Sequence, residues 1–216
     1  MAKNKIRKPK AAAYTATGRK LSNSSWVVFI AILISAGLLG SSLVFSLSGS
    51  FGGSGKGNAN QQTSEGLIKQ YQETLKTNPN DLTTRENLGV EYFNLGTTNL
   101  QQQKQAEGQN QLKLAIAEFE KVIEKNPKNA PVLGDLATSY FYTGNTDKAI
   151  EDARKALEVD PNLAPARLNL GIFLASKQQY AQAIEELKKV PAGSQQETSA
   201  KDMIKQYQEL LGAGKK

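Results

Sequence analysis

Apolar residues in the C-terminal two thirds of the chain recur at the spacing of α-helices, and prolines divide them into short segments. Between Pro127 and Pro161, one predicted helix presents large side chains on a single face and the next presents small ones. The large set is Leu133, Leu136 and Tyr140, and the small set is Ala149, Ala153 and Ala156. Small side chains let two helices approach closely, so this segment predicts a hairpin of two packed helices.

The same hairpin pattern repeats at a nearly fixed period. Asn-Pro or Asp-Pro pairs end predicted helices at Pro79, Pro127 and Pro161. The last two prolines are 34 residues apart, while the first two are 48 apart, an excess of 14. A fixed period in this range is typical of stacked structural repeats. We therefore expect an all-α solenoid of helical hairpins.

The hairpin before Pro161 resembles the tetratricopeptide repeat family. The positions that carry the resemblance are Leu136-Ala137-x2-Tyr140, Gly144, Ala149, Ala156 and Pro161. An earlier copy has Leu88-Gly89-x2-Tyr92, and a later copy has Leu170-Gly171 but carries Gln195 where the family has its closing proline. The resemblance implies a solenoid of about three repeats with flanking helices.

The resemblance covers residues 65–211. Repeats are predicted at 82–129, 130–163 and 164–193, with a capping helix at 194–211. The first repeat contains 14 extra residues, 97–110, which are rich in Gln. We expect them to lengthen both helices of the hairpin and to place its turn near Gly108-Gln109-Asn110. A Gln-rich loop is the alternative.

The resemblance also implies a concave groove, lined by the first helix of each hairpin, in which a peptide or helix of a partner commonly binds. Helical spacing places seven residues on that face: Glu86, Val90, Phe93, Thr138, Phe141, Leu168 and Ile172. The competing interpretation is that Phe93 and Phe141 pack between repeats. The groove residues are therefore a candidate recognition surface for a protein or peptide.

The N-terminal quarter of the chain has a different pattern. Residues 26–47 are 22 residues without a charge, 13 of them Val, Ile, Leu or Phe, which predicts one transmembrane helix. Residues 1–25 carry seven Lys or Arg and no acid, so the positive-inside rule predicts a cytoplasmic N-terminus and an extracytoplasmic repeat domain. Residues 48–64 are dominated by Gly, Ser, Asn and Gln and predict a flexible linker.

The composition of the chain limits the kinds of partner and reaction that we expect for it. The chain has 27 Lys and Arg against 20 Asp and Glu, a net charge of +7, and all of this surplus lies in residues 1–25. A repeat domain without net charge argues against nucleic acid as a partner. The chain has no His and no Cys, and its adjacent carboxylates, Glu151-Asp152 and Glu185-Glu186, diverge on a helix. We therefore predict no enzyme activity, no cofactor and no metal site.

Together these patterns predict a scaffold for protein interactions. It would be a single-pass protein of a prokaryotic plasma membrane, held by residues 26–47, with a role in envelope assembly or in the handling of secreted chains. Its partners would be proteins or peptides. Two alternatives stay open: a structural membrane protein that self-associates into a homo-oligomer without a separate groove ligand, and a soluble secreted domain released by signal cleavage.

Overall fold

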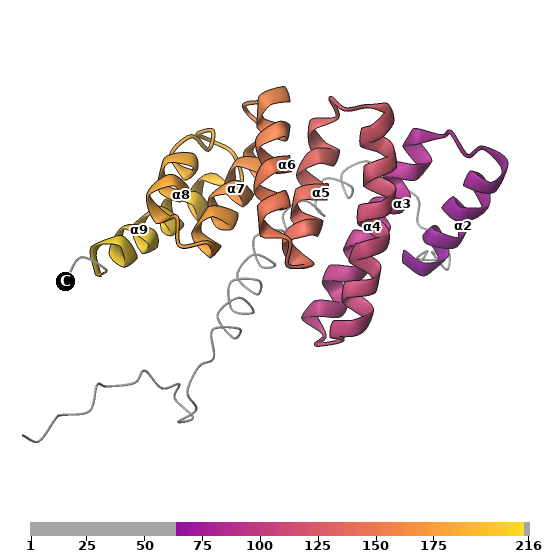
Figure 1. Cartoon of the computed structure of the whole chain (residues 1–216), viewed down its shortest axis with the longest axis horizontal. Helices are drawn as coiled ribbons and strands as arrows, with labels where there is room; N and C mark the ends of the chain where they lie inside the picture. Colours follow the sequence, from indigo (N-terminus) through magenta and orange to yellow (C-terminus); the bar gives the residue numbers. More distant parts are fainter. Residues whose placement is uncertain (1–63, 214–216) are drawn as a thin grey trace, which may run out of the picture.

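The computed structural model describes residues 64–213, which form eight α-helices and, in that range, no strand. The helices are α2 (Ser64–Thr77), α3 (Leu82–Gln101), α4 (Gln105–Lys125), α5 (Ala130–Tyr142), α6 (Thr146–Val159), α7 (Ala164–Ser176), α8 (Tyr180–Leu187) and α9 (Glu197–Ala213). They follow one another along an elongated stack, with α2 at one end and α9 at the other (Figure 1).

Consecutive helices pair into hairpins that stack side by side. The pairs are α3 with α4, α5 with α6, and α7 with α8, and neighbouring pairs meet through α4 with α5 and α6 with α7. Helix α2 packs on α3, and α9 packs on α8, so a further helix covers each end of the stack. This is the all-α helical solenoid that the sequence predicts.

Short polar residues set where the helices begin. The side chain of Asp81 accepts a hydrogen bond from the backbone N–H of Thr84 at 3.0 Å, and Asn129 accepts one from Val132 at 3.3 Å. Such caps satisfy N–H groups that have no partner within the first turn. A proline lies in the first turn of both α5 and α7, where its fixed backbone angle suits a helix start.

Small residues hold the two helices of each hairpin close together. Ala149, Ala153 and Ala156 of α6 are fully buried. A Cβ atom on Gly89 would lie 2.6 Å from the ring of Phe119, and one on Gly171 would lie 2.6 Å from Leu187 Cγ. Since neither neighbour leaves room for a side chain, the packing itself requires glycine at both positions.

The 14 extra residues of the first repeat are helical. Helices α3 and α4 have 20 and 21 residues, against 13 and 14 in α5 and α6, and they project beyond the neighbouring hairpins (Figure 1). The loop alternative is therefore wrong. The expected turn position is also wrong, because Gly108 lies inside α4 in close contact with α3, and the chain turns at residues 102–104, where Gln103 has a φ of 64°.

The predictions for residues 1–25, 26–47 and 48–63 lie outside the residues that the structure describes. Between residues 64 and 213, no helix is long and apolar enough to cross a membrane. Each helix in this range contains at least one charged residue.

Candidate functional site: the inner face of the stack

The first helices of the three hairpins adjoin one another, since α5 contacts both α3 and α7. The seven predicted groove residues lie on these helices, and we call them the inner stripe. Helix α3 contributes Glu86, Val90 and Phe93, α5 contributes Thr138 and Phe141, and α7 contributes Leu168 and Ile172.

The side chains of the inner stripe are less exposed on α5 and α7 than on α3. Glu86, Val90 and Phe93 of α3 are half-buried. The four residues on α5 and α7 are buried, with exposed fractions of 3% for Thr138, 7% for Phe141, 9% for Leu168 and 1% for Ile172. Side chains at the α3 end are therefore within reach of a ligand, whereas those at the α7 end are covered in this structure.

An aromatic row connects the two ends. The ring of Phe93 lies 6.3 Å from that of Tyr142, and Tyr142 in turn lies 6.2 Å from Phe141. Phe141 stacks on Phe173 of α7 at 4.6 Å. Phe141 therefore packs between hairpins, as the competing interpretation of the sequence holds, while Phe93 and Tyr142 keep part of their surface open.

Two carboxylates lie beside the open end. Burial, together with the nearby charge of Glu86, raises the pKa of Asp135 to about 7. Asn129 Nδ2 donates to Glu86 Oε2 at 3.0 Å, whereas no hydrogen bond to the Asp135 carboxylate is found among residues 64–213. Asp135 is therefore partly protonated near pH 7, and this end of the inner face is electronegative mainly through Glu86, which suits a cationic group.

The polar groups of the covered end satisfy one another. Asn169 Nδ2 donates to Thr138 Oγ1 at 3.0 Å, and the Thr138 hydroxyl donates to the carbonyl of Gly134 at 2.8 Å. Because buried polar groups with partners need no ligand, this end offers an essentially apolar surface.

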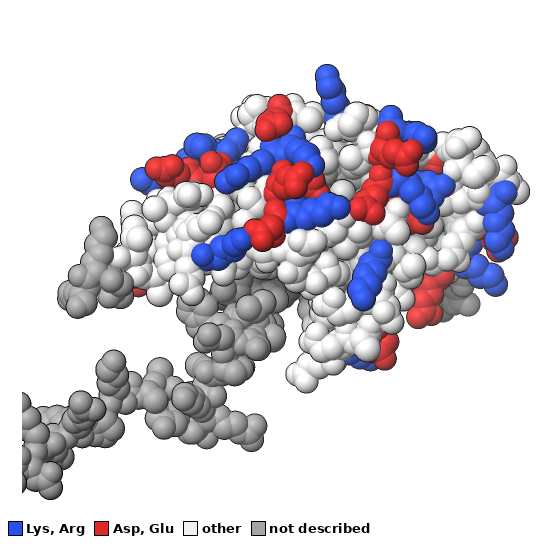
Figure 2. Space-filling view, viewed as in Figure 1, with Lys and Arg blue, Asp and Glu red and all other residues white. Residues whose placement is uncertain are grey.

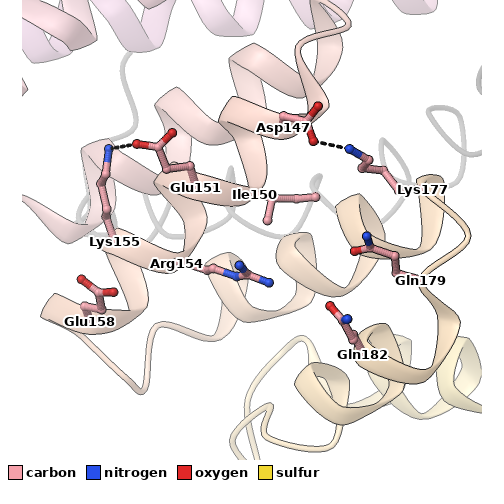
Figure 3. A pocket seen from close by; sticks show the side chains of 9 residues that line it. All are labelled: Asp147, Ile150, Glu151, Arg154, Lys155, Glu158, Lys177, Gln179 and Gln182. Carbon is pink, nitrogen blue, oxygen red and sulfur yellow. Dashed lines mark hydrogen bonds and ion pairs between the residues drawn. The ribbon is translucent and has the colours of Figure 1, made fainter.

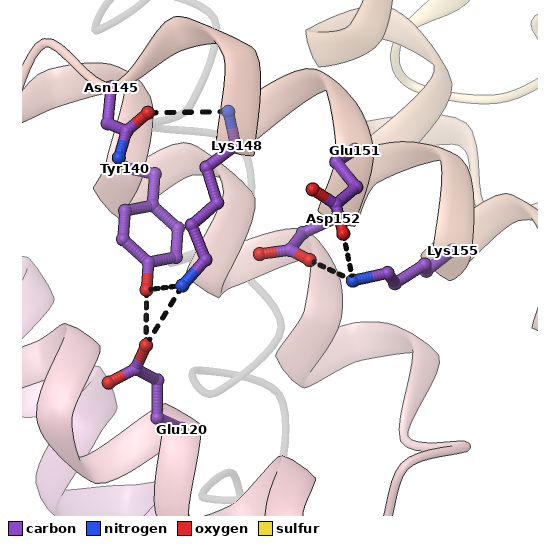
Figure 4. Close-up of polar contacts among 7 residues, drawn as sticks. All are labelled: Glu120, Tyr140, Asn145, Lys148, Glu151, Asp152 and Lys155. Atoms are coloured by element: carbon purple, nitrogen blue, oxygen red, sulfur yellow. Dashed lines mark hydrogen bonds and ion pairs between the residues drawn. The ribbon is translucent and has the colours of Figure 1, made fainter.

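The second helices carry the charged surface. Over the face in Figure 2, which includes α4 and α6, acidic and basic side chains lie next to one another. The Tyr140 hydroxyl donates to Glu120, and Lys148 Nζ donates to Glu120 at 3.1 Å (Figure 4). The hydrogen bond from Tyr140 lowers the pKa of Glu120. These contacts tie α4, α5 and α6 together.

The adjacent carboxylates Glu151 and Asp152 both contact Lys155, at 2.7 and 2.9 Å (Figure 4). Glu151 is exposed and Asp152 is buried, so the two side chains leave the helix in different directions. Within residues 64–213, no group of three or more His, Cys, Asp or Glu could hold a metal ion. The absence of catalysis and of cofactors remains a prediction.

A hollow of about 670 Å³ opens between α6 and the start of α8 (Figure 3). Asp147 and Lys177 pair across its rim, while Arg154 and Gln182 point into it. Acids and bases are mixed along its walls, so it has neither the apolar lining nor the single sign of charge that a ligand site normally has.

The seven predicted groove residues leave out two residues of the inner face. Asp135 and Tyr142 flank Thr138 at helical spacing, three residues before it and four after it. That spacing places them beside the inner stripe, and extending the stripe by one residue on either side would have included them.

Comparison with known proteins supports the fold and the repeat type. The tetratricopeptide repeat family matches residues 106–151 and 141–207. A crystal structure of MamA superposes with a TM-score of 0.60 at 23% identity, over 69% of this chain and 79% of that one. A MamA fragment from Desulfovibrio magneticus RS-1 superposes with a TM-score of 0.51 at 22% identity, over 58% of this chain and 63% of that one. At such identities the likeness shows the fold alone.

Two curated relatives each match about a third of this chain. A protein SGT1 homolog from Bos taurus is 37% identical over 71 residues, which is 33% of this chain and 21% of the relative. The small glutamine-rich tetratricopeptide repeat-containing protein 2 of Mycosarcoma maydis is 35% identical over 75 residues, 35% of this chain and 21% of the relative. The chain thus spans about a fifth of the length of these two relatives.

The localisation predicted from the sequence is corrected at this point. Neither the helices between residues 64 and 213 nor these relatives support a plasma-membrane protein with an extracytoplasmic repeat domain. The envelope role depended on that location and is not retained. The assignment rested entirely on residues 1–47, through the apolar length of residues 26–47 and the cations of residues 1–25, and no residue of the repeat region contributed to it.

Proposed function

We propose that this chain, in which residues 106–207 are tetratricopeptide repeats, is a scaffold that binds a protein or peptide partner on the inner face of its helix stack. The observation that carries the proposal is the half-buried surface of Val90, Phe93 and Tyr142, which lies next to Glu86 and Asp135. Partly exposed apolar side chains beside a few polar groups are the usual composition of a recognition surface.

The chemistry of this end of the inner face narrows the partner. The aromatic rings offer contact to apolar side chains, and the two carboxylates favour a Lys or Arg side chain. The partner segment is therefore an extended or helical peptide with apolar residues and at least one cation. Residues of the inner stripe on α5 and α7 support this surface from behind.

The test is a selection of peptides from a random library on the full chain, followed by affinity measurements with fluorescence anisotropy. Val90→Asp is expected to weaken binding of the selected peptides at least tenfold. The matched control is Leu114→Asp, which also converts an exposed apolar residue to an acid but lies on α4, at 44% exposure.

Leu114→Asp is expected to leave the affinity unchanged. Equal affinity in wild type and Val90→Asp would reject the inner face as the binding surface. Self-association, the alternative function, predicts no selectable peptide and a mass in solution that rises with chain concentration.

A further inference from the structure

The helices at the two ends of the stack contain the same short sequence. Residues 68–73 of α2 and residues 204–209 of α9 both read Ile-Lys-Gln-Tyr-Gln-Glu. The two helices lie at opposite ends of the stack, where α2 packs on α3 and α9 packs on α8 (Figure 1). Because the six residues are identical, the two ends can be compared position by position.

Helix α9 uses its copy of this sequence to close its end of the stack. The ring of Tyr207 lies 5.8 Å from that of Tyr180 on α8. The exposed side of α9 carries Lys205, Gln208 and Glu209. A polar outer side is what the last helix of a repeat stack requires in water. The α9 end therefore needs no further neighbour.

Helix α2 stands in the place of a second helix, but residues 64–213 contain no first helix for it. The second helices α4 and α6 each pack on the first helix of their own hairpin. In α4, Phe119 makes this contact, because its ring fills the space beside Gly89 of α3. Phe119 lies eight residues before Pro127, and Tyr71 of α2 lies eight residues before Pro79. Tyr71 is therefore on the side of α2 where a first helix would pack.

This side of α2 carries no charge. It consists of Leu67, Tyr71 and Thr74, which we call the end face and which fall within an arc of about 60° at about 100° per residue. The four charged residues of α2 are at least about 100° away from the end face. They are Glu65, Lys69, Glu73 and Lys76. An uncharged face can meet an identical copy of itself without repulsion between like charges.

We propose that the end face is a contact between two copies of this chain, in which α2 packs antiparallel on α2 of the second copy, with the two-fold axis near Tyr71. This inference goes beyond the proposed function, because α2 carries none of the inner stripe. A two-fold contact requires only one surface and is the commonest arrangement of homo-oligomers. The exposed side of α9 is charged and does not match the end face.

The tyrosine contact at the α9 end indicates how the two copies of α2 would pack. A residue close to a two-fold axis meets its own copy, so Tyr71 would meet Tyr71 of the second chain. The equivalent residue of α9, Tyr207, already packs on a tyrosine ring, and tilted aromatic pairs at such distances are favourable. The same six residues would thus make the same kind of contact within a chain at one end and between chains at the other.

The size of the contact sets its strength. Helix α2 has only 14 residues. Two helices of this length bury less than the roughly 1,200–2,000 Å² of a stable protein interface. We therefore expect single chains at low concentration and dimers at high concentration.

Disulfide trapping in the full chain tests the contact, because the chain has no cysteine of its own. Tyr71→Cys is oxidised at high chain concentration, and the matched control is Glu73→Cys, at an exposed position on the other side of the same helix. Tyr71→Cys is expected to form a disulfide between two chains at least ten times faster than Glu73→Cys. Equal rates would overturn the proposal. Faster pairing of Tyr71→Cys with Gln208→Cys than with itself would also overturn it, since α2 would then pack on α9.

Sedimentation of chains without cysteine gives a second readout. The mass of the wild-type chain is expected to rise with concentration to that of two chains and no further. Leu67→Asp is expected to weaken this association at least tenfold, whereas Leu114→Asp, the same substitution on α4, should keep the wild-type value. A mass that stays at one chain would overturn the proposal, as it would if residues 1–63 of the same chain occupied the end face. A mass that rises beyond two chains would overturn the two-fold contact.

The result can be separated from the test of the proposed function. If Tyr71→Cys traps no dimer while Val90→Asp still weakens peptide binding, only the contact through the end face is rejected. If trapping succeeds while Val90→Asp has no effect on peptide affinity, the proposed function alone is rejected. The dimer leaves the inner stripe free, so we expect peptides to be selected whether or not the chains are paired.

Discussion

Helices α3 and α7 are the first helices of two hairpins. They make the same kind of arginine contacts, yet their inner faces differ in how exposed they are. Arg85 Nη1 donates to Glu118 at 2.5 Å and Arg167 Nη1 to Glu186 at 2.8 Å, and both arginines also donate to a proline carbonyl at 2.6 Å. On the inner face, Val90 is half-buried, whereas the equivalent Ile172 is 1% exposed. The arginine contacts repeat in the two hairpins, and the difference lies on the inner face, which is the surface proposed to bind a partner.

The arginine contacts also show how the first hairpin accommodates its extra length. Arg85 and Glu118 are 33 residues apart, and Arg167 and Glu186 are 19 apart, a difference of 14 that equals the insertion. Both arginines pair with a glutamate of the second helix and with a proline carbonyl, so the insertion lies beyond these contacts, at the tip of α3 and α4. The part of the first hairpin that faces the rest of the stack is unaltered.

The largest expected effect is the contrast between Ile172→Asp and Val90→Asp. A carboxylate at the buried position 172 would lose its hydration without a partner, so we expect a loss of about 4 kcal/mol in the free energy of unfolding. At the half-buried position 90 the acid keeps its water, and the loss should stay below about 1 kcal/mol. Urea unfolding followed by circular dichroism measures both, and equal losses would mean that the two inner faces are alike.

The second largest expected effect tests the arginine contacts that the two hairpins share. Replacing Arg85 or Arg167 by Met leaves Glu118 or Glu186 without its main partner, and each is mostly buried. We expect a loss of about 2 kcal/mol for both variants, nearly equal in size. Lys76→Met, which removes an exposed ion pair of α2, is the control and should not shift the urea midpoint. A large effect for only one arginine would show that the contacts are not equivalent.

Asp135→Asn tests the electronegative end of the inner face. The pKa of Asp135 is raised from 3.8 to about 7, so between these values the folded chain retains a proton that the unfolded chain releases. Stability from this group therefore falls as pH rises from about 4 to 7, and it is lowest above pH 7. We expect Asp135→Asn to be about 1 kcal/mol more stable than wild type at pH 8. The decrease of stability with rising pH should be absent in this variant.

Urea midpoints between pH 4 and pH 8 measure the slope. Glu158→Gln, at an exposed position of α6, should keep the wild-type slope and serves as the control. A slope that persists unchanged in Asp135→Asn would mean that another group titrates in this range.

Tyr140→Phe should have the smallest effect. It removes the hydroxyl that contacts Glu120 and Lys148, both of which are substantially exposed and can turn to water. We expect a loss of about 0.5–1 kcal/mol and no change in peptide affinity, because these groups lie away from the inner stripe. Thermal unfolding and anisotropy measure the two quantities. A tenfold loss of peptide affinity would place the binding surface on the outer face instead.

The sequence predicted the repeat well because its signals are local. Proline spacing and the alanines at 149, 153 and 156 follow from contacts within one hairpin. The turn of the first hairpin was missed, since Gly108 serves the contact between α3 and α4 while Gln103 adopts the left-handed conformation. Periodicity likewise placed Leu168 and Ile172 on the inner face, but it gives only the direction of a side chain and not what covers it.

The most direct test of an inner face with one open and one covered half is the rate of thiol modification in a chain that has no other cysteine. Val90→Cys and Ile172→Cys, each in the full chain, would be treated with iodoacetamide under native conditions and followed by mass spectrometry. The account predicts that Val90→Cys reacts at least ten times faster than Ile172→Cys, with equal rates after unfolding in urea. Equal rates in the folded chains would contradict it.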